Sequence, residues 1–137
     1  MLKKKDVVMI DGYNMLKTHI IESIKLLASS PETQLSLLPD FVNKPYEMAT
    51  SLSDWLLLYN NGLMCKKEPL FSDFEIESIT KLNSMFTGFE DSKSFEKSDW
   101  TEEAVRTSEK WEEVRKFAKH ILSILGIEYS LPDKRSV

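Results

Sequence analysis

Apolar residues recur every three or four positions along most of this chain, which is the spacing of an amphipathic helix. Residues 14–28 carry one such stripe, and further stripes begin near Pro31, Pro45, Ser72 and Thr101. We therefore expect an all-α single domain, a bundle of about five to six helices. The residues expected in its core are Ile20, Ile24, Leu27, Leu38, Leu52, Trp55, Ile79, Leu82, Phe86, Trp111, Val114, Ala118, Ile121 and Leu125.

Helix-capping residues support these boundaries. Ser30 precedes Pro31, and proline suits the first position of a helix. Ser72 and Glu75 have the spacing of a capping box, in which each side chain accepts a hydrogen bond from the other residue's backbone N–H. Thr101 is expected to cap the next helix and Ser108 to restart it. A C-terminal stop is expected at Gly126.

Three segments lie outside this pattern. Residues 6–13 fit either a short N-terminal strand or the start of the first helix, and Gly12 disfavours a continuous helix. Residues 63–71 and 89–99 are predicted to be loops. The ordered core is expected to cover about residues 6–129 of the single domain 1–137, with a loose tail over 130–137. Phe41 and Val42, between two helices, are expected to fill part of the core.

Composition excludes several classes of protein. The net charge of −4 over 137 residues disfavours nucleic-acid binding, which needs a surplus of lysine and arginine. A single cysteine, Cys65, excludes an internal disulfide and a cysteine-based zinc cluster. The apolar run that ends at Ile10 is too short for a signal peptide or a membrane span. We therefore expect a cytoplasmic protein that contacts no membrane.

Candidate catalytic chemistry is sparse. Residues 7–14 (VVMIDGYN) resemble the first strand of NYN-type ribonucleases, which implies a metal-binding role for Asp11 and a matching position for Asn14. The rest of the sequence supplies no further strands on which to complete such a site. His19 and His120 have no second ligand at metal-binding spacing, and Cys65 has no histidine partner. The sequence thus favours binding over catalysis, with no catalytic residue, metal or cofactor.

Charge is unevenly distributed near the C-terminus. Nine acidic and four basic residues lie between Glu90 and Glu113, giving −5, whereas the chain from Val114 onward carries +3. One interpretation is a solvated helix surface whose charges are sorted for the helix dipole. The other is an acidic docking surface for a basic protein. The candidate partner-binding residues are Asp91, Asp99, Trp100, Glu102, Glu103, Glu109, Glu112 and Glu113.

Two sequence blocks resemble small bacterial immunity proteins of contact-dependent growth inhibition and related toxin systems. One block spans residues 24–42 (IKLLASSPE, QL and LPDFV), and the other comprises residues 100–105 (WTEEAV) and 111–115 (WEEVR). The resemblance implies that the chain binds and neutralises the C-terminal domain of a cognate toxin, often a nuclease. The alternatives are a metal-dependent ribonuclease using Asp11 and a structural helical module that forms homo-oligomers. The sequence does not specify the oligomeric state.

Overall fold

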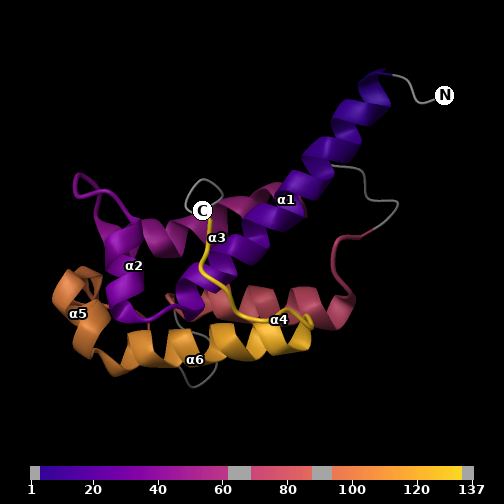
Figure 1. Cartoon of the computed structure of the whole chain (residues 1–137). Coiled ribbons are helices and arrows are strands. Elements are labelled where there is room, and N and C mark those ends of the chain that lie inside the picture. The colour runs from indigo at the N-terminus through magenta and orange to yellow at the C-terminus, as the bar shows by residue number, and fades with distance from the viewer. Residues whose placement is uncertain (1–3, 62–68, 88–93, 134–137) are drawn as a thin grey trace.

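A computed structural model describes residues 4–61, 69–87 and 94–133, with side chains in the first helix from Met15 onward. All regular structure in these ranges is helical, which confirms the all-α bundle (Figure 1). The elements are α1 (Lys4–Ala28), α2 (Pro31–Leu37), α3 (Lys44–Asn60), α4 (Asp73–Ser84), the 3-10 turn η1 (Lys97–Trp100), α5 (Glu102–Thr107) and α6 (Glu109–Ile124).

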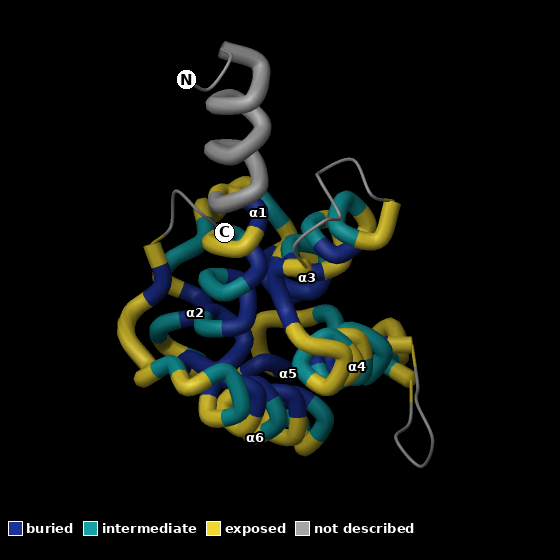
Figure 2. Tube along the Cα trace, turned by 90° about the vertical axis from the view of Figure 1, so that its right-hand side faces the viewer, coloured by how far each residue is buried: buried dark blue, intermediate teal, exposed yellow. Residues whose placement is uncertain are grey.

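The first helix is the centre of the bundle. α1 packs mainly against α6 and α3, and α4 closes the core against α6 and α3. Its stripe of Leu16, Ile20, Ile24 and Leu27 is almost fully buried, as the spacing predicted. Seen from the side, the buried parts of α1, α3 and α6 meet in the middle of the molecule (Figure 2).

The predicted core is largely confirmed. Eleven of the fourteen predicted residues are buried, and Trp111 is the largest of those that are fully buried. Leu38, Trp55 and Leu125 are half-buried and pack against this core from its edge. Phe41, however, does not fill the core, because 89% of its surface is exposed. The expectation for Phe41 was wrong because this residue lies in the connection between α2 and α3. Helical spacing predicts which side chains face the core only within a helix.

The predicted helix starts are confirmed by hydrogen bonds. The hydroxyl of Ser30 accepts from the N–H of Thr33, and that of Thr101 accepts from Ala104. Ser72 and Glu75 form the reciprocal capping box of α4. Ser108 caps the start of α6, where its hydroxyl accepts from the N–H of Lys110. Gly126 has a φ of +70°, a left-handed conformation that suits glycine and terminates α6.

The alternative of a strand over residues 6–13 was wrong. The backbone is helical from Lys4, and Gly12 does not interrupt it. A helix satisfies its backbone polar groups internally, whereas a strand needs a neighbour with which to pair. The N-terminal turns of α1 extend beyond the other helices (Figure 1). Asp11 thus lies within a helix, not at the strand end that the ribonuclease resemblance requires.

Part of the predicted loose tail packs against α1. Tyr129 Oη lies 2.8 Å from Ser29 Oγ, and Lys25 Nζ donates to Ser130 Oγ at 2.9 Å. The N–H of Asp133 donates to Glu22 Oε2 at 3.0 Å, and the intervening Pro132 is buried. The expectation of a loose tail was therefore wrong for residues 130–133. Residues 134–137 lie outside the described ranges, as do 62–68, which include Cys65.

A buried polar pair joins four helices. Gln34 Nε2 donates to the carbonyls of Leu26 and Leu27, both at 3.1 Å, in the last turn of α1. Gln34 Oε1 accepts from Arg115 Nη1 at 3.2 Å, and the same nitrogen donates to the carbonyl of Val105 at 2.8 Å. The pair thus satisfies carbonyl groups at the ends of α1 and α5, which lack partners within their own helices.

The charge of Arg115 is balanced from the same helix. Its Nε and Nη2 donate to Glu112 Oε2 at 3.2 and 3.1 Å, although only 4% of the Arg115 surface reaches solvent. A buried charge needs such a partner, since isolated burial is costly. Neither Gln34 nor Arg115 stands out in the sequence, because long polar side chains usually face solvent.

We expect Arg115→Leu to lower the free energy of unfolding by about 2–4 kcal/mol, because it leaves buried carbonyls without donors. Urea titration followed by circular dichroism measures the change. Lys119→Leu is the matched control, since it removes a positive charge from an exposed position on the same helix. If the two substitutions have equal effects, Arg115 does not hold the helix ends together.

Candidate functional site

Five of the predicted interface acids lie on the surface of α5 and α6. Glu102 and Glu103 are in the first turn of α5, and Glu109, Glu112 and Glu113 are in the first turns of α6. All five are exposed, and we call them the acidic surface. Glu112 is paired with Arg115, but the other four make no ion pair with any residue in the described ranges.

The helix dipole accounts for part of this charge. Glu102 and Glu103 lie near free backbone N–H groups at the start of α5, and Glu109 and Glu112 lie near those of α6. Acids in a first turn are stabilised by about 0.3–1 kcal/mol each. This benefit explains why acids occur at these positions. It does not remove the negative potential that they present to solvent.

Asp99 is buried, unlike the five exposed acids of the acidic surface. Only 9% of its surface is exposed, and its carboxylate accepts from Lys110 Nζ and from the N–H of Glu96, both at 2.8 Å. Ser108 Oγ approaches its other oxygen at 3.4 Å. Asp99 is therefore a structural carboxylate, which corrects the expectation that it is an exposed interface charge. Because it neutralises Lys110, that lysine offsets little of the acidic surface.

Opposing effects set the pKa of the Asp99 carboxyl. Burial alone would raise the pKa by disfavouring the charged form, but the hydrogen bonds from Glu96 and Lys110 and the charge of Lys110 outweigh it. The result is a pKa below the ordinary value of 3.8. The carboxylate is therefore charged and bound in the folded protein at neutral pH.

Trp100 is half-buried in an aromatic cluster. Its ring centroid lies 5.0 Å from Phe95, 5.9 Å from Phe86 and 6.3 Å from Trp111. Tyr46 of α3 meets it edge-on at 5.8 Å. The cluster gives this indole a fixed position beside the start of α5. Asp91 lies outside the described residues.

The same cluster shows that the predicted loop 89–99 has internal structure at its C-terminal end. Phe95 packs against Phe86 and Trp111 at 4.9 and 5.1 Å, and its N–H donates to the carbonyl of Phe86. Trp111 Nε1 donates to the carbonyl of Asp99 at 2.8 Å. A buried indole thus fixes η1 and the start of α5, so the acidic surface rests on a well-packed base.

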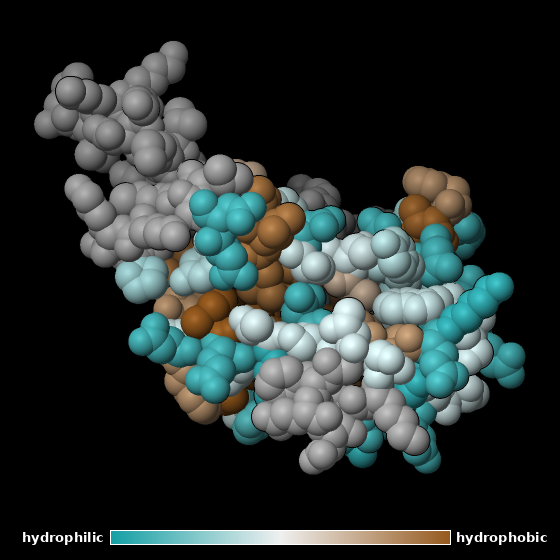
Figure 3. All heavy atoms as spheres, turned by 180° about the vertical axis from the view of Figure 1, so that it is seen from behind, coloured by the Kyte–Doolittle hydropathy of each residue, from teal (hydrophilic) through white to brown (hydrophobic). Residues whose placement is uncertain are grey.

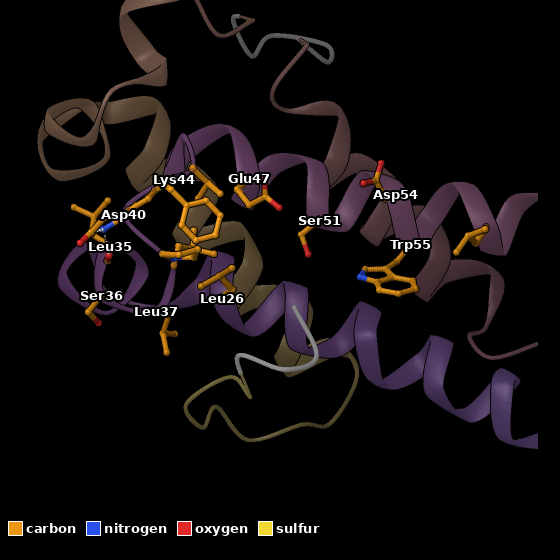
Figure 4. A pocket seen from close by; sticks show the side chains of 15 residues that line it. Leu26, Leu35, Ser36, Leu37, Asp40, Lys44, Glu47, Ser51, Asp54 and Trp55 are labelled. Carbon is orange, nitrogen blue, oxygen red and sulfur yellow. Dashed lines mark hydrogen bonds and ion pairs between the residues drawn. The ribbon is translucent and has the colours of Figure 1, made fainter.

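A second surface feature was not expected from the sequence. An open groove of about 1020 Å³ lies where the α2–α3 connection meets α3 and the end of α1. Leu26, Leu37, Trp55 and Leu58 contribute apolar side chains to it (Figure 4). At the end of the molecule where this connection lies, apolar atoms stand out against hydrophilic surroundings (Figure 3).

Acidic side chains accompany this apolar surface. Glu47 and Asp54 of α3 and Asp40 of the α2–α3 connection line the groove and are exposed. Lys44 is the only base lining it within the described residues, and it donates to the carbonyl of Leu35 and to Asp40 at 2.7 and 3.0 Å. The only sequence signal for the groove is Phe41, an aromatic residue in a short connection between two prolines.

Among the described side chains, no three histidine, cysteine, aspartate or glutamate residues lie close enough together to hold a metal ion. His19 stacks on Trp55 with centroids 4.0 Å apart and planes 4° apart. In the same part of the chain, no helix has the length and apolar character needed to cross a bilayer.

No family model, no curated protein and no solved structure matches the chain.

The low pKa of Asp99 predicts a pH-dependent stability. A folded-state pKa below the unfolded value stabilises the protein above pH 3.8, and this contribution is lost as the pH falls through the folded-state pKa. We expect Asp99→Asn to be less stable than the wild type by about 2 kcal/mol at pH 7. The difference should shrink as the pH falls from about 5 to about 2.

Urea titrations across this range measure the two stabilities. Glu113→Gln, which removes an exposed carboxylate from α6, should leave the stability nearly unchanged at pH 7. A constant difference between wild type and Asp99→Asn at all pH values would contradict the role of the Asp99–Lys110 pair.

Proposed function

We propose that this chain is an immunity protein that binds a basic toxin domain and blocks its active site by protein–protein contact. The observation that carries the proposal is the acidic surface. Four of its carboxylates are exposed and lack an ion pair to any described residue, and the nearby Lys110 is neutralised by Asp99. The resemblance of residues 24–42, 100–105 and 111–115 to immunity proteins of contact-dependent growth inhibition supports the same function.

The electrostatic argument concerns the toxin's substrate. A nuclease domain carries positive charge because it must attract a polyanion, and a surface of carboxylates can occupy the same positive site. Opposite potentials speed association and disfavour partners of the same sign. Inhibition of this kind requires no catalytic group, metal or cofactor from the inhibitor. It would take place in the cytoplasm, where an incoming toxin acts.

The packing beneath the acidic surface suits this role. Thr101 and Ser108 fix the starts of α5 and α6, and the indole of Trp111 holds the preceding turn. Arg115 ties the end of α5 to α6. A surface that is rigid before binding loses little conformational entropy on association, so more of the interaction energy contributes to affinity. Trp100, half-buried beside this surface, is a candidate aromatic anchor.

The test begins with the partner. An upstream open reading frame that encodes a large secreted protein with a variable C-terminus would identify the candidate toxin. Its C-terminal domain should form a complex with this chain, and co-expression should prevent its toxicity. We expect the combined reversal of Glu102, Glu103 and Glu109 to lysine to weaken binding at least tenfold at about 50 mM salt, and less at about 500 mM. Calorimetry measures the affinity.

A control with the same change in net charge separates the acidic surface from the overall charge. Glu32, Glu77 and Glu128 are exposed on other parts of the molecule, and their reversal to lysine should leave the affinity within about twofold of wild type. Unchanged affinity of the first variant at low salt would remove the acidic surface from the interface. Absence of any complex or protection would reject the immunity function. Manganese-dependent RNA cleavage, lost in Asp11→Asn, would instead favour the ribonuclease alternative.

A further inference from the structure

The groove beside α3 has the form of a binding site for an extended ligand. Glu47, Ser51, Asp54, Trp55 and Leu58 line it from successive turns of the helix (Figure 4). Their spacing places them along one side of α3, and the segment from Glu47 to Leu58 measures about 17 Å at 1.5 Å per residue. A groove of this length suits a polypeptide segment better than a compact metabolite.

The walls of the groove are fixed by contacts made elsewhere in the fold. The ring of Trp55 is held by stacking on His19 of α1. Ser51 Oγ lies 2.9 Å from Ser23 Oγ, where α1 and α3 approach each other closely. Lys44 holds the α2–α3 connection by bonding both Leu35 and Asp40. A ligand would therefore meet a surface that is already formed.

The side chain of one aromatic residue beside the groove, Phe41, packs against little of the protein. Phe41 is 89% exposed, although burying an aromatic side chain of this size would contribute about 1.5–3 kcal/mol. It lies at the groove with Val42, which is only half-buried. A ligand that lies along the groove could cover both residues and recover part of this energy.

The charges along the groove specify the ligand further. Asp40, Glu47 and Asp54 give it a negative border. Lys44, the one basic residue among the described residues that line it, is buried and directs its charge to Asp40 and the Leu35 carbonyl. An apolar surface with an acidic border complements a segment that carries leucine-like residues on one side and lysine or arginine on the other. An anionic lipid surface or nucleic acid would be repelled.

We propose that this groove binds a basic amphipathic helix of about 12–15 residues from a protein partner, in the helix-in-groove mode. Its apolar residues would cover Trp55, Leu58 and Phe41, and its basic residues would pair with Glu47 and Asp54. The site is separate from the acidic surface of α5 and α6. The proposal therefore holds or fails independently of the immunity function.

The test uses a defined probe. The probe is a fluorescein-labelled 14-residue peptide of leucine and lysine arranged so that the leucines form one helical stripe. At about 1.5 Å per residue such a helix is about 21 Å long and extends slightly beyond the groove segment of α3. Fluorescence anisotropy with the full chain measures its affinity. One control peptide has the same composition in a scrambled order, and a second has glutamate in place of lysine. We expect at least tenfold tighter binding of the first peptide than of either control.

Paired variants assign the position of binding. Glu47→Lys combined with Asp54→Lys should weaken the peptide at least tenfold. Glu77→Lys combined with Glu128→Lys makes the same change in charge at exposed positions outside both surfaces, and it should have less than a twofold effect. Phe41→Ser, at an exposed position, should weaken it about threefold to tenfold without loss of helicity by circular dichroism. Quenching of tryptophan emission by the peptide should be much reduced in Trp55→Phe.

Three results would overturn the proposal. Equal binding of the striped and scrambled peptides would show attraction by charge alone. Equal weakening by the two double variants would show that the groove is not the site. Finally, concentration-dependent dimers in light scattering that disappear in the Glu47→Lys and Asp54→Lys double variant would assign the groove to a second copy of this chain.

Discussion

The fold depends on one buried polar contact, between Gln34 and Arg115. Helix ends carry carbonyl groups without partners, and two such ends, those of α1 and α5, lie inside this bundle. The amide of Gln34 satisfies the first, the guanidinium of Arg115 satisfies the second, and the two side chains bond each other at 3.2 Å. The hydrophobic effect is non-directional, whereas a hydrogen bond requires a particular donor to face a particular acceptor. Directional hydrogen bonds fix which helix ends meet, and thereby fix the position of α5, which carries Glu102 and Glu103 of the acidic surface.

The helical period and the capping residues allowed much of this architecture to be predicted from the sequence. They predicted the stripe of α1, the capping box at Ser72 and the stop at Gly126, because these features depend on residues a few positions apart. The helical period could not predict the exposure of Phe41 or the contacts of residues 130–133, because these residues lie outside the helices and their positions depend on distant elements. Polar residues posed the opposite difficulty. Asp99 and Arg115 follow the pattern of surface residues, and only the approach of other elements encloses them.

The two candidate surfaces would act at different ranges. The acidic surface of α5 and α6 would act mainly through its charge, so its attraction would extend over about a Debye length of 8–10 Å and weaken with salt. The groove beside α3 combines charge with exposed apolar area, which contributes only on contact and changes little with salt. A basic partner that used both would be attracted first by charge and retained by apolar burial. The separation of the two surfaces on different helices allows their contributions to be measured one at a time.

The pairing of α1 with α6 has a consequence for synthesis. The main partner of the first helix begins at Glu109, about 80 residues after α1 ends at Ala28, so of its two main partners only α3 is available to cover α1 until α6 has been synthesised. Long sequence separations of this kind slow folding, because closing the intervening chain costs entropy. Until then, the part of the apolar stripe of α1 that α6 covers is accessible to chaperones or to neighbouring nascent chains. Each helix can therefore form from local contacts during synthesis, but the complete burial of α1 requires residues that are synthesised much later.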